Sequence, residues 1–312
     1  MENKHLYKES IKKDNYTVIN CEECGYWHVY PMPTEDELNN YYESKYYHNL
    51  GDNRSMTDKL DDPDGFYAIQ YEDGLRYITK IFPRDLPKTI IDIGAGYGDF
   101  LIFMKNNGWS ACGVEPSKYA YQNIKDKSLD IKLGNIEQVY AEFKPASLVT
   151  LNSVLEHVGD PRRVLDVIRD YLLLPRGILS IIVPNDFNIL QDLAKRTVLK
   201  NTPEKQYYWV VPPEHINYWT IKTIRKFLKR CGFEVLGIIT DFPMEIFLLM
   251  GDNYVTNSEI GRNVHLKRVR FEKNLQEANL REFKDLIFGS FAKLGIGRCM
   301  QVFATTKISK KN

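Results

Sequence analysis

The chain has 312 residues, of which 43% are apolar and 27% are charged. This balance is ordinary for a globular protein and excludes a collagen, a long disordered chain or a pure coiled coil. The formal net charge of +1 gives no general attraction to nucleic acid or to an acidic membrane, so we expect neither as a partner.

The N-terminus and the cysteines indicate a cytoplasmic protein. No apolar run reaches the roughly 18–20 residues that a membrane helix needs. Residues 1–5 do not open an apolar signal segment, so the expected location is the cytoplasm. The five cysteines include only one close pair, Cys21 and Cys24, which is not the pattern of a disulfide framework.

We expect the chain to divide into a core with additions at both ends. Residues 1–50 form a cap rich in cysteine and tyrosine, and residues 51–88 a linker that includes a helix around 67–81. The core spans 89–240 and carries a lid at 185–218. A helical insertion at 241–298 follows, and residues 299–312 hold the last strand and a tail.

In the core, strand-like and helix-like runs alternate. Short β-branched runs predict strands at 89–93, 110–114, 131–133, 146–151, 177–183, 233–239 and 300–305. Helices are expected at 100–105, from a Ser117 cap to about 125, from an Asp160 cap, and from a Thr220 cap to Gly232. This alternation predicts an α/β fold with a mostly parallel seven-stranded sheet and helices on both faces.

The helical insertion carries an apolar stripe. Its members are Phe271, Leu275, Ala278, Phe283, Ile287, Phe291 and Leu294, at roughly helical spacing. Such a stripe packs on the core or on a second subunit, and the sequence leaves both open. We expect a homodimer through residues 264–294 in the second case.

The segment after the first core strand is rich in glycine. Gly94, Gly96 and Gly98 let the backbone turn sharply, so that amides point at a ligand from the start of a helix. Glu115 ends the next strand, where a carboxylate can accept hydrogen bonds from both hydroxyls of a ribose. Asp99 takes the place of the last glycine of a dinucleotide fingerprint and would repel a pyrophosphate. The pattern therefore predicts a nucleoside cofactor without phosphates.

Four motifs occur in the order known from one enzyme family. They are residues 92–98 (Asp-Ile-Gly-Ala-Gly-Tyr-Gly), 114–116 (Val-Glu-Pro), 133–136 (Leu-Gly-Asn-Ile) and 151–158 (Leu-Asn-Ser-Val-Leu-Glu-His-Val). The chain resembles class I S-adenosylmethionine (SAM)-dependent methyltransferases, which have a Rossmann-like fold. Residues 212–219 (Pro-Pro-Glu-His-Ile-Asn-Tyr-Trp) resemble a branch that includes sugar C- and O-methyltransferases and ubiquinone-pathway-like enzymes.

This resemblance implies a cofactor and an acceptor. The implied SAM-binding residues are Asp92, Gly94, Ala95, Gly96, Gly98, Phe100, Glu115, Pro116, Asn135, Ile136 and Asn152. The implied substrate is a small polar acceptor, most plausibly a sugar hydroxyl or carbon of a nucleotide-sugar or polysaccharide precursor. Alternatives are a quinone or other small metabolite, or a non-enzymatic nucleic-acid or partner-binding module with a decayed cofactor pocket.

Three residues are candidates for the chemistry. His157 follows the fourth strand at the sheet edge and is the expected general base, because histidine is largely neutral near pH 7. His215, in the lid, is the second candidate, and Glu156 could orient an imidazole or bind a substrate hydroxyl. Tyr41, Tyr42, Tyr46 and Tyr47 could cover the cofactor or stack on a sugar, or form a buried aromatic cluster.

The N-terminal cysteines resemble half of a metal site. In related sugar methyltransferases the leader usually includes two Cys-x-x-Cys knuckles that hold zinc, whereas this chain has only Cys21 and Cys24. A structural zinc ion needs four ligands. His5 and His28 could supply the other two, but nothing in their spacing requires it. We therefore expect no metal, with zinc as the less favoured alternative.

Overall fold

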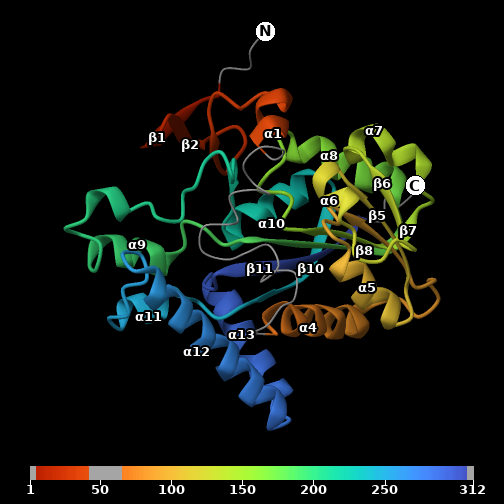
Figure 1. The fold of residues 1–312 in the computed structure, drawn as a ribbon. Coiled ribbons are helices and arrows are strands. Elements are labelled where there is room, and N and C mark those ends of the chain that lie inside the picture. The colour runs from red at the N-terminus through yellow and green to blue at the C-terminus, as the bar shows by residue number, and fades with distance from the viewer. Residues whose placement is uncertain (1–4, 42–64, 308–312) are drawn as a thin grey trace.

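The computed structural model describes residues 5–41 and 65–307 of the chain. Its centre is a seven-stranded sheet in the order β10-β11-β8-β7-β4-β5-β6 (Figure 1). The strands are β4 (Thr89–Ile93), β5 (Ser110–Glu115), β6 (Asp130–Leu133), β7 (Ala146–Asn152), β8 (Leu173–Pro184), β10 (Phe233–Thr240) and β11 (Cys299–Thr306). Neighbouring strands from β8 to β6 run parallel, and β11 is antiparallel to both β8 and β10. The predicted fold is confirmed.

Helices cover both faces of this sheet (Figure 1). On one side α4 (Phe66–Ile81) and α5 (Asp99–Asn106) pack on residues such as Ile90. On the other, α8 (Pro161–Val167) and α10 (Ile221–Arg230) pack on residues such as Ile91. Because successive strand residues point to opposite faces, the run of isoleucines in β4 serves both cores.

The predicted helix caps are present. The side chains of Ser117, Asp160 and Thr220 accept hydrogen bonds from backbone amides in the first turns of α6 (Lys118–Gln122), α8 and α10. Helix α6 ends at Gln122, so the prediction that it reaches about residue 125 is wrong. A short helix α7 (Ile136–Val139) and a 3-10 turn η2 (Tyr140–Glu142) follow β6, and a π-helical turn η3 (Ile168–Leu172) joins α8 to β8.

A second, smaller sheet links the cap to the lid. It has the order β1-β2-β3-β9, formed by β1 (Tyr7–Lys13), β2 (Tyr16–Cys21), β3 (Trp27–Val29) and β9 (Asn217–Tyr218). Asp14 has a φ of 52° in the turn between β1 and β2. Helix α1 (Glu35–Tyr41) ends the described part of the cap, and Tyr42, Tyr46 and Tyr47 lie outside the described residues.

The insertion is largely helical, whereas the lid consists mostly of turns and loops with short helical segments. The lid contains α9 (Ile189–Arg196) and a 3-10 turn η4 (Pro203–Lys205), and the insertion contains α11 (Glu245–Leu249), α12 (Ser258–Glu277) and α13 (Arg281–Leu294). The predicted apolar stripe is divided between α12 and α13, because the chain turns at Asn279 with a φ of 56°. Among the described residues, no helix is both long and apolar enough to cross a bilayer.

Candidate active site

The three glycines after β4 have different neighbours. All have positive φ, at 75° for Gly94, 55° for Gly96 and 86° for Gly98. A Cβ atom on Gly94 would lie 2.5 Å from Val154, and one on Gly98 would lie 2.7 Å from Leu129. A Cβ on Gly96 would meet no atom within 4 Å. The outer glycines therefore allow close packing, whereas Gly96 borders open space that a ligand can approach.

Glu115 fixes the glycine loop. Its side chain is buried, and its two oxygens accept hydrogen bonds of 2.8 Å from the amides of Gly96 and Ser117. A carboxylate has about four acceptor positions, so it can accept from several donors at once. The carboxylate thus lies directly beside the open position at Gly96. This arrangement suits a ribose whose two hydroxyls donate to one acid.

A polar cluster lies where β4 and β7 end. Burial raises the pKa of Asp92 to about 7, although Thr150 donates a hydrogen bond of 2.5 Å to its carboxyl group. The amide of Asn152 also donates to Asp92, over 3.3 Å. Within the described residues the buried Asn152 Oδ1 has no hydrogen-bond partner. An unpaired buried acceptor at this sheet edge suits a ligand that donates a hydrogen bond.

The other expected cofactor residues differ in burial. Ala95, Phe100 and Ile136 are buried, and Phe100 packs in the core beneath α5. Asn135 precedes α7 without a side-chain cap bond, and Pro116 is exposed. Their roles in binding stay predictions.

His157 and His215 face each other at the carboxyl end of β7. Their rings are 5.0 Å apart in an edge-to-face arrangement. His157 Nδ1 lies 2.5 Å from the carbonyl oxygen of Glu214, which can only accept, so Nδ1 carries the proton and Nε2 the lone pair. Nε2 is 3.8 Å from the carboxylate of Glu156. The structure therefore brings together the three residues predicted for the chemistry.

Burial determines the charge of these groups. It lowers the pKa of both His157 and His215 to about 3 and raises the pKa of Glu156 to about 8. The imidazoles are therefore neutral at neutral pH. Ligand atoms of the three side chains lie within 4.8 Å of one another, so the cluster could also hold a metal ion.

Sequence reasoning missed the ion pair behind this cluster. Asp186 follows β8, and its buried carboxylate is 2.8 Å from the guanidinium of Arg298, which precedes β11. Asp186 helps to raise the pKa of Glu156, and Arg298 helps to lower that of His215. Asp186 could have been found as a polar residue directly after a predicted strand. Arg298 could have been predicted only with the knowledge that the last strand is antiparallel to its neighbours.

Comparison with known proteins identifies the family. A family model described as a methyltransferase domain matches residues 67–238, more than half of the chain. The chain belongs to this methyltransferase family. The expected enzyme class and cofactor are therefore confirmed: the protein is a SAM-dependent methyltransferase. The glycine loop, the acid beside it and the unpaired Asn152 oxygen fit that cofactor.

Solved methyltransferases have a related fold at low sequence identity. The plantazolicin methyltransferase BpumL, solved with SAH, is 15% identical to this methyltransferase, covering 86% of this chain and 94% of its own, with a TM-score of 0.51. A SAM-dependent methyltransferase from Archaeoglobus fulgidus is 16% identical over 77% and 94% of the two chains, with a TM-score of 0.47. At such identity the BpumL match supports the fold alone. No curated protein matches the sequence significantly.

Proposed function

We propose that this methyltransferase acts on a hydroxyl group of a small polar acceptor, with His157 as the general base. The observation that carries the proposal is the tautomer of His157. Its Nδ1 proton is engaged by the Glu214 carbonyl, so the lone pair lies on Nε2 in a buried, neutral ring. A hydroxyl needs such an acceptor for its proton when it attacks carbon.

The proposed reaction assigns a task to each group. Bound SAM would supply an electrophilic methyl group and would leave as the thioether SAH when its sulfur–methyl bond breaks. Glu115 and the glycine loop would hold the ribose, and His157 Nε2 would take the proton of the acceptor hydroxyl. The buried His215 Nδ1 lacks a hydrogen-bond partner among the described residues, so it is available to orient the acceptor. The rest of the rate enhancement comes from alignment of the acceptor with the methyl group.

A sugar is the proposed acceptor class. The support is the resemblance of residues 212–219 to sugar methyltransferases, together with a cleft of about 680 Å³ between the cap and Pro212–Pro213. Tyr16, Tyr30 and Tyr41 line this cleft, and aromatic rings suit the apolar face of a sugar. The cytoplasmic location and the absence of a nucleic-acid partner stay predictions.

Isotope transfer tests the proposal. The protein is incubated with SAM labelled with ¹³C in its methyl group and with three acceptor pools: nucleotide sugars, quinone-type phenols and peptides. Mass spectrometry finds the labelled product, and the ¹³C chemical shift identifies the methylated atom. We expect an O-methylated sugar. Label on a carbon or nitrogen atom would exclude the role of His157 as a hydroxyl base, and label only on phenols or peptides would exclude the sugar.

A further inference from the structure

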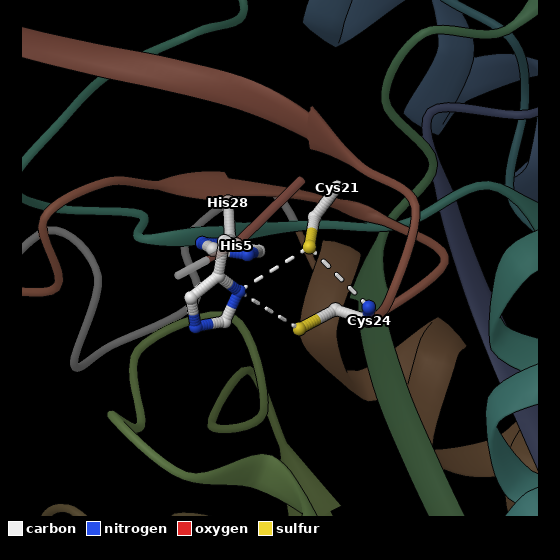
Figure 2. Close-up of side chains that lie close together, drawn as sticks. All are labelled: His5, Cys21, Cys24 and His28. Atoms are coloured by element: carbon white, nitrogen blue, oxygen red, sulfur yellow. Dashed lines mark hydrogen bonds between the residues drawn. The ribbon is translucent and has the colours of Figure 1, made fainter. Parts of the chain in front are cut away.

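Two cysteines and two histidines of the N-terminal sheet converge on one point. Cys21 ends β2, Cys24 lies in the turn to β3, His28 belongs to β3, and His5 precedes β1. Their ligand atoms all lie within 4.8 Å of one another. Figure 2 shows the His5 ring directed at both sulfur atoms, with His28 beside it.

The distances match the edges of a coordination tetrahedron. His5 Nδ1 is 3.3 Å from Cys21 Sγ and 3.5 Å from Cys24 Sγ. Zinc binds sulfur at about 2.3 Å and imidazole nitrogen at about 2.0–2.1 Å, so tetrahedral angles place nitrogen and sulfur ligands about 3.6 Å apart. The histidine therefore lies within a few tenths of an ångström of a zinc ligand's position relative to both sulfurs.

His28 supplies an independent observation. Its side chain is buried, and its Nδ1 is 2.8 Å from the carbonyl oxygen of Val29, so Nδ1 carries the proton. Nε2 therefore presents a lone pair, and within the described residues this buried atom has no hydrogen-bond partner. Zinc-ligating histidines typically donate their other ring proton to a carbonyl or carboxylate in this way.

The turn that carries the cysteines has the shape of a metal-binding knuckle. Gly25 has a φ of 76°, and the Cys24 amide donates to Cys21 Sγ over 3.3 Å. Both thiols are free. The thiolate is the form of cysteine that binds metal.

We propose that His5, Cys21, Cys24 and His28 bind one structural zinc ion. The sequence did not favour this site because it has only one Cys-x-x-Cys pair, and the histidines are brought to it by strand pairing. Four protein ligands leave no open position, so the ion takes no part in methyl transfer. Its role is to join the chain before β1 to the β2–β3 turn.

The site also connects to the active-site loop. His28 pairs with Asn217 across β3 and β9, and the Val29 amide donates to the carbonyl of Ile216 over 2.9 Å. Asn217 is two residues from His215. On the other side, Arg230 of α10 donates to the carbonyls of Glu23 and Cys24. Zinc binding should therefore hold the strand that places His215.

Metal analysis of the full chain tests the proposal. The protein is purified without chelator or affinity metal, and zinc is measured by mass spectrometry and by release with a thiol-blocking mercurial into a chromogenic chelator. We expect about one zinc ion per chain. Replacement by Co²⁺ should give an intense visible spectrum typical of a tetrahedral site, with sulfur-to-cobalt charge transfer in the near ultraviolet.

Variants locate the ion. The double variant Cys21→Ser/Cys24→Ser should lose the zinc and the charge-transfer band, whereas Cys112→Ser and the pair His157→Ala/His215→Ala should keep both. Full zinc content in the double cysteine variant would show that the metal binds elsewhere and would overturn the proposal. Loss of zinc from His157→Ala/His215→Ala alone would do the same. A wild-type protein that contains no zinc and gives only an octahedral cobalt spectrum would also overturn it, whether or not the variants fold.

Discussion

Glu115 fixes the glycine loop, and we propose that it also offers acceptors to a ribose. Glu115→Ala removes the acceptors of the Gly96 and Ser117 amides together with those for the ribose. Hydrogen bonds to a charged group contribute about 1.5–3 kcal/mol each. We therefore expect SAM affinity, measured by calorimetry, to fall at least about tenfold. The exposed Glu142→Ala serves as the control, and unchanged affinity in a folded Glu115 variant would show that the cofactor site is assigned wrongly.

His157 should matter for turnover and not for cofactor binding. His157→Ala removes the proposed proton acceptor, and a positioned base typically contributes about 10²–10⁴ in rate. We expect kcat to fall about a hundredfold or more while the Kd for SAM is unchanged, with partial recovery at higher pH as the acceptor ionises. His265→Ala is the control. If His215→Ala abolishes turnover and His157→Ala is mild, the two histidines exchange roles.

Glu156 should give the protein a measurable pH dependence of stability. Its folded pKa of about 8 exceeds its ordinary value of 4.5, so the folded chain holds a proton that the unfolded chain releases between these values. This contribution is complete below about pH 4.5 and is lost as the pH rises towards 8. Each pKa unit corresponds to about 1.4 kcal/mol.

Glu156→Gln removes this pH-dependent contribution to stability and keeps the shape of the side chain. From pH 5 to pH 8 the free energy of unfolding, measured with urea, should therefore fall more steeply in the wild type than in the variant. His157 and His215 act in the opposite sense, because their lowered pKa stabilises the fold above about pH 6.5 and less so as the pH falls towards 3. Both proteins share that contribution. Equal slopes in wild type and Glu156→Gln, with the exposed Glu142→Gln as control, would contradict the assignment.

At the scale of elements, the mostly parallel sheet and the helix caps were predicted from local signals, although α6 ends earlier than predicted. The pairing of the cap with the lid was not predicted. Strand β9 was missed because two residues, Asn217 and Tyr218, carry no periodicity of their own. They are a strand only because β3, nearly two hundred residues earlier, pairs with them.

The same distinction applies to the site. Glu156, His157 and His215 were predicted individually, but their convergence depends on the lid's return to β7. The amides of Ile216 and Asn217 both donate to the Glu156 carbonyl, over 2.9 and 3.0 Å. No pattern in the sequence predicts that contact. The proposed metal ligands are a further example, since His5 and Cys21 meet only because β1 and β2 form a hairpin.

At the scale of the whole molecule, α12 extends beyond the sheet (Figure 1), whereas α13 packs against β10, where the Thr240 hydroxyl donates to the Phe288 carbonyl. Lys284 ties α13 to the rest of the protein through ion pairs with Asp73 and Glu272. Phe283, Leu286 and Leu294 remain 50%, 71% and 69% exposed. Large apolar side chains grouped on one helix often mark a contact with another protein. The sequence leaves two roles open for this segment, packing on the core and contact with a second subunit, and the exposed side chains suit the second.

If α13 forms a homodimer contact, a charge on that surface should separate the two subunits. Leu286→Asp would place an unpaired carboxylate in the contact, which costs much more than the loss of one apolar side chain. Light scattering after size exclusion should give twice the 36.4 kDa of the chain for the wild type and for the exposed control Lys222→Asp. The Leu286 variant should give the mass of one chain and keep its affinity for SAM, because α13 contributes no residue to the proposed cofactor site. If the wild type stays monomeric at every concentration measured, the dimer is excluded. The exposed side chains of α13 then belong to the surface of the monomer.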